Sequence, residues 1–251
     1  MQGKLLGAKL AWGFFFDYDG VLSPLDVERS RAFPPKDRLE MLSYLRSRGV
    51  VVAVVSSKDC PFLMSRGLDV DAVACVNGLE VRVPGYVILD ERVLDPSKQV
   101  KFTKLVDVAE EAIGEEAYLE KKKLSLDLLV GVSIDWRSRG QEPSKLWEVV
   151  SLAKELEFPI KWVSREPFID IYIVDVEKDL AVKLLRKILN VSKVVYFGDS
   201  PRDLPAFEAS DISVFVRHSS NRDITVSQVN YVVNYEELPE WVVHLATELY
   251  S

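Results

Sequence analysis

Four aspartates lie in two short segments whose composition is typical of a metal-dependent site. Asp17 and Asp19 belong to the segment DYDGVL, and Asp199 and Asp203 belong to the segment GDSPRD. Two unit charges 4 Å apart repel each other by about 4 kcal/mol at an effective dielectric constant of 20, so clustered carboxylates require a cation. Because oxygen ligands suit Mg²⁺, the four aspartates predict a magnesium site that could accept a phosphate.

The elements that would position these residues are buried strands of a parallel sheet. Apolar runs at 10–16, 50–55 and 193–197 each end immediately before a polar segment, and Ser56 and Ser57 follow the second run. Ligands of open parallel sheets bind outside the carboxyl ends of the strands, so these segments should converge on one edge. Side chains alternate along a strand, so Asp17 and Asp19 should face the same side.

The rest of the chain alternates short strands with helices of period 3.6, the pattern of an α/β fold with a Rossmann-like parallel sheet. The expected helices of this core are 36–47, 59–66, 177–189, 203–209 and one from 238. Leu39, Leu42, Tyr44 and Leu45 should form the inner face of the first. The further core strands are expected at 72–76, 212–216 and 231–233.

Between residues 80 and 173 the pattern changes to a smaller α+β layer. Short alternating strands are expected at 81–89, 117–120, 125–135, 160–164 and 169–174, with helices at 97–113 and 144–156. Alternation indicates that one face of a sheet is solvated. We therefore expect a core formed by residues 1–79 and 174–251 and an inserted domain formed by residues 80–173.

Composition excludes several classes of protein. The 251 residues include 32 basic and 39 acidic ones, and the net charge of −7 disfavours nucleic acid as a partner. No apolar run reaches the roughly 18 residues of a membrane span, and no signal peptide is recognised, so a cytoplasmic protein without a membrane partner is expected. Cys60 and Cys75 are interpreted as small core residues in a reducing compartment. His218 and His244 are expected at the surface, away from the acidic site.

The motifs DYDGVL, VVAVVSS, Lys178 and GDSPRD occur in the order found in the haloacid dehalogenase-like hydrolase superfamily, which this chain resembles. The resemblance implies that Asp17 is a nucleophile that becomes an aspartyl phosphate and that Asp19 is the general acid and base. It also implies that Ser56 and Lys178 contact the transferring phosphoryl group. Mg²⁺ would be held by Asp17, the backbone carbonyl of Asp19 and Asp199, with Asp203 orienting a metal-bound water or the loop; Gly20 and Ser57 would line the substrate site.

The position of the insertion resembles that of a C2-type cap, which closes over the site in this superfamily and implies a small phosphorylated metabolite as substrate. The segment FFFDYDGVLSPL is similar to the trehalose-6-phosphate phosphatases, and 119–126 resembles their VExKxxS cap segment. This implies sugar contacts by Glu120 and Lys122. A carboxylate and an ammonium group on a cap strand suit sugar hydroxyls, although a charged strand end has the same composition.

Several alternatives stay open. Departures from the trehalose-6-phosphate phosphatase motifs at Val21, Lys58 and Asp179 keep sucrose-phosphate and mannosyl-3-phosphoglycerate phosphatases as alternatives. A phosphomannomutase-like transferase would use the same aspartate pair, and a regulatory protein with a dead site would keep only the fold. The chain could be a monomer or a small homo-oligomer.

Overall fold

The structure is a computed structural model that describes residues 11–25, 27, 29–163 and 166–250. The chain divides into two compact units. The first contains the residues up to Val55, Arg66–Ala72 and the residues from Asp179 onward, and the second contains Ser56–Ser65 and Val73–Lys178. The predicted insertion, 80–173, lies inside the second unit, and its limits stay a prediction.

The first unit is built on five parallel strands. They are β1 (Trp12–Phe16), β2 (Val51–Val55), β10 (Lys193–Gly198), β11 (Ile212–Arg217) and β12 (Tyr231–Asn234), in the order β12-β11-β10-β1-β2. The apolar runs of β1, β2 and β10 are buried on both faces, as their composition predicted. The α/β fold class is therefore confirmed. Leu10, which was predicted to begin the first strand, lies outside the described residues.

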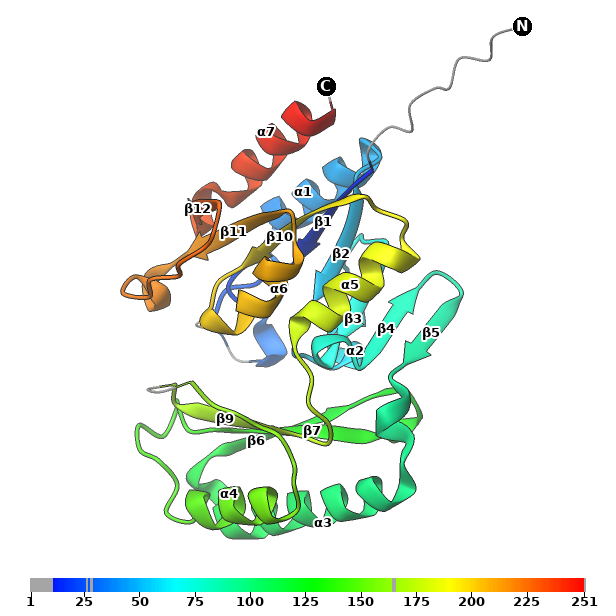
Figure 1. Cartoon of the computed structure of the whole chain (residues 1–251). Coiled ribbons are helices and arrows are strands. Elements are labelled where there is room, and N and C mark those ends of the chain that lie inside the picture. Colours follow the sequence, from blue (N-terminus) through cyan, green and yellow to red (C-terminus); the bar gives the residue numbers. More distant parts are fainter. Residues whose placement is uncertain (1–10, 26, 28, 164–165, 251) are drawn as a thin grey trace, which may run out of the picture. The chain divides into compact units, whose positions relative to one another are not determined.

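Helices cover both faces of this sheet. Figure 1 shows α1 (Lys36–Ser47) and α7 (Leu238–Tyr250) on one face, where the two helices contact each other, and α5 (Lys178–Ile188) and α6 (Leu204–Ala209) on the other. The chain passes from β1 to β2 on one side and later returns to β10 on the opposite side of β1. The boundary between β1 and β10 is thus a topological switch point, where ligands bind in open α/β sheets.

The inner face of α1 differs in part from the prediction. Leu42 and Leu45 are buried as expected, but the prediction for Tyr44 was wrong because its side chain is exposed. Arg38 is buried instead: its guanidinium donates to the carbonyl of Val21 at 3.2 Å and to the carbonyl of Tyr235. These carbonyls come from distant parts of the sequence, so the period of the helix could not reveal them.

Asp211 fastens the beginning of β10. Its carboxylate accepts hydrogen bonds from the backbone N–H of Val194 at 2.9 Å and from Lys193 Nζ at 2.7 Å, and it pairs with Arg186. Burial alone would raise the pKa of Asp211, but these donors and the charge of Arg186 outweigh burial and lower the pKa below its ordinary value. Asp211 therefore stabilises the fold in its ionised form.

The second unit contains two antiparallel groups of strands. In one group, β3 (Ala72–Cys75), β4 (Glu80–Val83) and β5 (Tyr86–Leu89) pair in chain order. The other is a four-stranded sheet in the order β6-β7-β9-β8, formed by Tyr118–Lys123, Leu129–Asp135, Phe168–Tyr172 and Ile160–Lys161. Figure 1 shows α3 (Pro96–Ile113) and α4 (Leu146–Glu155) side by side along one face of this sheet. The short helix α2 covers Cys60–Met64.

The turn before β7 shortens the strand that was predicted at 125–135. Leu126 and Asp127 have positive φ angles of 67° and 60°, which are incompatible with a strand, and β7 begins only at Leu129. The side chain of Leu126 is 83% exposed, so its apolar character had indicated a strand wrongly. Ser164, predicted as the end of another strand, lies outside the described residues.

Cys60 and Cys75 form a disulfide between the first residue of α2 and the last residue of β3. Both residues are fully buried, which confirms the prediction of core positions. The interpretation of the pair as simple core residues was nevertheless wrong, because the bond crosslinks two elements. A sequence separation of 15 residues did not reveal that these two ends would meet.

Candidate active site

Three buried carboxylates meet at the switch point of the first unit. Asp17 follows β1, Asp199 follows β10, and Asp203 ends the short 3₁₀ turn Pro201–Asp203. Each offers one oxygen atom, and these atoms all lie within 4.8 Å of one another. The three residues are at most 7% exposed. Among the described residues, the predicted convergence of strand ends is therefore realised for these three aspartates.

The loop after β1 is held by backbone hydrogen bonds. The N–H of Asp17 donates to the carbonyl of Phe197 on β10 at 2.8 Å, which places Asp17 beside that strand. The N–H of Tyr18 donates to Asp17 Oδ1 at 2.7 Å and orients the carboxylate. Asp19, half-buried, belongs to the tight turn that follows, where Ser23 N–H donates to the carbonyl of Tyr18. The two acids of the DYDGVL motif thus have different surroundings.

Two glycines provide the space for the acidic side chains. A Cβ on Gly20, whose φ is +73°, would stand 2.6 Å from Cγ of Asp199 and closer still to Oδ2. A Cβ on Gly198 would stand 2.6 Å from the Cβ of Asp203 and closer still to its Cγ. Real carbon atoms do not approach so closely, so the absence of side chains at these positions is a requirement of the cluster. Gly20 was predicted to line the substrate site, and its close approach to Asp199 explains why a glycine is needed at this position.

Asp203 uses both carboxylate oxygens within the first unit. Oδ2 accepts from the backbone N–H groups of Asp199 and Ser200, both at 3.1 Å, and Oδ1 accepts from the hydroxyl of Tyr196 at 2.9 Å. Burial raises the pKa of Tyr196 well above its ordinary value, and the charges of Asp203, Asp17 and Asp199 add to this effect. The phenol therefore keeps its proton and remains a donor to Asp203.

His218 was predicted at the surface away from the acidic site, and this prediction was wrong. His218 directly follows β11, and its Nε2 lies 2.8 Å from Asp199 Oδ2. The side chain is 12% exposed. The rule that selected Asp199, a polar residue at the end of a parallel strand, also selects His218, so the signal was present in the sequence. His244 is 73% exposed, as predicted.

The remaining predicted residues, among them Ser56, Ser57 and Lys178, lie in the second unit. Ser56 is buried, and its Oγ accepts from the N–H of Lys58 at 3.2 Å. The backbone carbonyl of Ser57 accepts from Lys122 Nζ at 3.2 Å. Lys178 is 6% exposed at the first position of α5. The catalytic and binding roles of Ser56, Ser57 and Lys178 stay predictions.

Glu120 and Lys122 belong to a buried network of charges on β6. Lys58 Nζ lies 3.2 Å from Glu120 Oε2, and Lys122 Nζ lies 3.4 Å from Glu120 Oε1 and 3.9 Å from Asp170 Oδ1. The side chain of Lys122 is only 2% exposed. Ser133 on the adjacent β7 donates to Asp170 Oδ1. This burial distinguishes the pair from the ordinary charged strand end with the same composition.

Ser125, the serine of the segment that resembles the VExKxxS motif, has a structural partner. Its N–H and its hydroxyl donate to the two oxygens of Glu80 at 2.6 and 2.8 Å. Glu80 is fully buried and also pairs with Arg82 at 2.7 Å. Ser125 therefore fastens the turn before β7 to β4.

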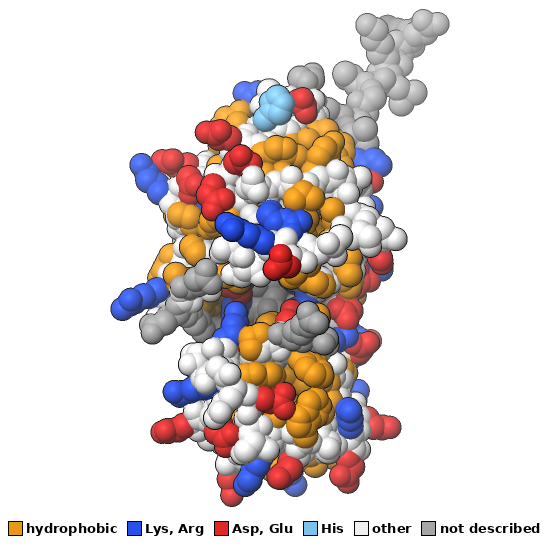
Figure 2. Space-filling model, turned by 90° about the vertical axis from the view of Figure 1, so that its left-hand side faces the viewer, with side chains coloured by type: hydrophobic (Ala, Val, Ile, Leu, Met, Phe, Trp, Pro, Cys, Tyr) orange, Lys and Arg blue, Asp and Glu red, His pale blue; other side chains and the backbone are white. Residues whose placement is uncertain are grey.

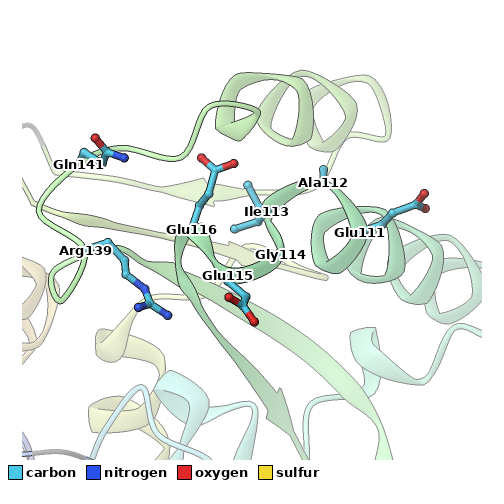
Figure 3. A pocket seen from close by; sticks show the side chains of 8 residues that line it. All are labelled: Glu111, Ala112, Ile113, Gly114, Glu115, Glu116, Arg139 and Gln141. Carbon is cyan, nitrogen blue, oxygen red and sulfur yellow. The ribbon is translucent and has the colours of Figure 1, made fainter.

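A separate pocket of about 500 Å³ in the second unit contains none of the predicted site residues. It is lined by 111–116, Arg139 and Gln141. Figure 3 shows the carboxylate of Glu111 pointing away from Arg139. Glu116 accepts from the N–H and hydroxyl of Ser144 at 2.6 and 2.9 Å, and these bonds lower its pKa. The carboxylate of Glu116 therefore stabilises the local fold.

Comparison with known proteins gives a family match. A family model described as haloacid dehalogenase-like hydrolase matches residues 143–237. This segment contains Lys178 and the GDSPRD motif, whereas Asp17 lies outside it. A curated relative, alpha,alpha-trehalose-phosphate synthase [UDP-forming] B of Dictyostelium discoideum, is 24% identical over 204 residues, or 78% of this chain. The match spans only 25% of that relative's length.

Solved structures share the fold over almost the whole chain. A trehalose-6-phosphate phosphatase related protein has a TM-score of 0.67 at 17% identity and covers 94% of this chain and 97% of its own. The C-terminal domain of trehalose-6-phosphate phosphatase from C. albicans has a TM-score of 0.69 at 18% identity, with coverages of 96% and 92%. The family match and these structures confirm the predicted resemblance to haloacid dehalogenase-like hydrolases, and they support the interpretation of the chain as an enzyme.

Figure 2 shows one face of the molecule, on which Lys and Arg side chains are interspersed with Asp and Glu.

In the part of the chain that the structure describes, no helix combines the length and the apolar character that crossing a membrane requires. The cytoplasmic location stays a prediction.

Proposed function

Since this chain has the fold and the motifs of a haloacid dehalogenase-like hydrolase, we propose that it is a Mg²⁺-dependent phosphomonoesterase that hydrolyses a small sugar phosphate. The observation that carries the proposal is the buried cluster of Asp17, Asp199 and Asp203 at the switch point. Three carboxylates in so small a volume repel one another strongly, so a cation stabilises their ionised forms.

The donor set of the cluster fits a hard cation. Asp17, Asp199 and the backbone carbonyl of Asp19 would hold Mg²⁺ through oxygen atoms. Asp203 would act differently, because its oxygens accept hydrogen bonds from Tyr196 and from two backbone N–H groups. It would therefore keep the loop that carries Asp199 in place. Bound Mg²⁺ would neutralise charge on the phosphate as the nucleophile approaches.

Asp17 and Asp19 would divide the chemistry between them. The Asp17 carboxylate, oriented by the N–H of Tyr18, attacks phosphorus while the bond from phosphorus to the sugar oxygen breaks, and Asp19 donates a proton to that oxygen. Asp19 then accepts a proton from a water molecule that attacks the aspartyl phosphate. This step releases inorganic phosphate and restores Asp17. Ser56 and Lys178 would bind the phosphoryl oxygens.

The buried network around Lys122 supports a sugar phosphate as the substrate class. Burying an ion costs several kcal/mol unless partners compensate. Apolar side chains would stabilise this region more than the charged groups of Lys58, Lys122, Glu120 and Asp170, so the charges favour a role in binding. Ammonium groups and carboxylates together offer the donors and acceptors that sugar hydroxyls need. Relatives named for trehalose phosphate favour trehalose 6-phosphate as the specific substrate.

The reaction is tested with an aryl phosphate, because this substrate makes no demand on sugar recognition. We expect phosphate release that requires Mg²⁺, is abolished by a chelator and falls by a factor on the order of a thousand or more in Asp17→Asn. Asp223→Asn, which changes an exposed aspartate of the same unit, is the matched control and should be fully active. Equal turnover in Asp17→Asn and Asp223→Asn would refute the proposed reaction.

The substrate is tested with trehalose, sucrose, mannose and glycerate phosphates. Lys122→Met should lower kcat/KM for trehalose 6-phosphate by about a hundredfold, because it leaves polar partners unpaired, while changing aryl phosphate turnover far less. Lys121→Met on the same strand is the control, since Lys121 is half-exposed and pairs with Glu110. A loss that is equal for all substrates would contradict the assigned sugar contact.

A further inference from the structure

His218 is held in one orientation beside Asp199. β11 pairs in parallel with β10, so the residues after these two strands are neighbours. His218 Nε2 lies 2.8 Å from Asp199 Oδ2. The ring is largely buried, and its other nitrogen, Nδ1, accepts from the N–H of Ser220 at 3.2 Å.

The hydrogen bond at Nδ1 fixes the tautomer of a neutral ring. A ring nitrogen that accepts a hydrogen bond carries no proton, so the proton lies on Nε2 and points at Asp199. His218 is thus placed to donate from Nε2 to the Asp199 carboxylate.

Asn221 ties the backbone of His218 to that of Asp199. Its Oδ1 accepts from the N–H of His218 at 2.9 Å, and its Nδ2 donates to the carbonyls of Asp199 and Val216, both at 2.8 Å. Asn221 is only 2% exposed. The position of His218 is therefore set by a buried residue whose hydrogen bonds reach the same loop.

The Asp199 carboxylate is limited on a second side by Gly20, against which its Oδ2 packs. Its backbone N–H is held by Asp203 at 3.1 Å. The backbone N–H of Asp199, its Oδ2 atom and the space around its side chain are thus each fixed by a neighbouring residue. Such outer hydrogen bonds orient the ligands of metal sites, and their loss typically costs 10–100-fold in metal affinity.

We propose that His218 is a positioning residue that orients Asp199 and thereby sets the cation affinity of the Asp17, Asp199 and Asp203 cluster. The proposal rests on the function proposed above, because it requires that Asp199 bind a cation. It extends that function by assigning a role to a histidine outside the aspartate motifs. In this role His218 would act through Asp199 and not by contacting the substrate or the cation itself.

The test measures cation binding without turnover, by titrating the protein with Mn²⁺ and detecting free Mn²⁺ by electron paramagnetic resonance. His218→Leu removes the donor and should raise the Kd for Mn²⁺ by about 10–100-fold. His218→Gln keeps an N–H of similar reach and should stay within about threefold of wild type. His244→Leu, at the exposed histidine of the same unit, should not change the Kd.

Asp199→Asn separates failure of this proposal from failure of the proposed function. If Asp199→Asn loses Mn²⁺ binding while folded His218→Leu binds as wild type, the role of His218 is refuted and the metal centre stands. If Asp199→Asn also binds as wild type, the metal centre itself is refuted. Should His218→Leu not fold, His218→Asn replaces it. Asparagine is too short to reach Asp199, so this variant should bind Mn²⁺ weakly while His218→Gln binds it well, and equal affinities would refute the proposal.

Discussion

Replacement of Gly20 by alanine should disable the acidic site with only a moderate loss of stability. The φ of +73° makes any side chain at this position unfavourable by about 1–2 kcal/mol. The new Cβ would also stand 2.6 Å from Cγ of Asp199. Carbon atoms in contact are about 3.5–4.0 Å apart, so the Asp199 carboxylate must move by roughly 1 Å.

A shift of that size removes the hydrogen bond from His218 to Asp199, which is 2.8 Å long. A misplacement of about 1 Å in a catalytic group can cost on the order of a hundredfold in rate. We therefore expect Gly20→Ala to lower Mg²⁺-dependent kcat/KM by about a hundredfold and to weaken Mn²⁺ binding. The assay is phosphate release from an aryl phosphate, together with thermal unfolding.

Gly49→Ala is the matched control. Gly49 has a φ of +77° in the same unit, and a Cβ there would meet nothing within 4 Å. Both variants should therefore lose the stability that the positive φ costs, with Tm falling by about 2–4 °C for each kcal/mol, and Gly20→Ala should lose somewhat more because Asp199 must move. Only Gly20→Ala should lose activity. Equal activities of the two variants would refute the inference that the approach of Gly20 to Asp199 is what shapes the site.

Three further predictions concern stability. Replacing Cys60 and Cys75 by alanine should lower the free energy of unfolding, measured by urea titration, by up to about 3 kcal/mol, because the disulfide closes a loop of 15 residues. An unchanged free energy of unfolding would show that the crosslink does not stabilise the fold. Tyr196→Phe should cost about 1–3 kcal/mol because Asp203, which is fully buried, loses a donor; a cost near zero would contradict this. Because the pKa of Asp211 is lowered on folding, the stability that its ionised carboxylate contributes is present above a pH of about 4 and is lost as pH falls through the folded-state pKa. Asp211→Asn should therefore make the free energy of unfolding depend less on pH below about 5. Parallel curves of unfolding free energy against pH for the two proteins would contradict the assignment.

The architecture could be predicted largely from local patterns. Buried strands such as Val51–Val55 are apolar throughout and rich in valine, and α1 has the predicted bounds, 36–47. These elements agree with the structure because burial and period act within a few residues of sequence. The turn before β7 was missed because Leu126 is apolar yet exposed in a left-handed conformation, which its residue type does not indicate.

The acidic cluster followed from strand-end reasoning, but other features of the fold depend on where separate elements meet in space. The burial of Arg38 depends on a carbonyl 197 residues away, and the disulfide depends on where α2 begins and β3 ends. His218 was overlooked for a different reason. The strand-end rule was applied to aspartates and hydroxyls but not to the residue after β11, where it would have indicated the same site.

Trapping a phosphate mimic on Asp17 tests the central claim most directly. Beryllium fluoride binds an aspartate nucleophile as the aspartyl phosphate would, and ¹⁹F nuclear magnetic resonance detects the bound form without any choice of substrate. The account predicts bound fluoride resonances that require Mg²⁺, persist in Asp223→Asn and are absent in Asp17→Asn. Resonances that remain in Asp17→Asn, or that never form in the wild-type protein with Mg²⁺ present, would contradict it.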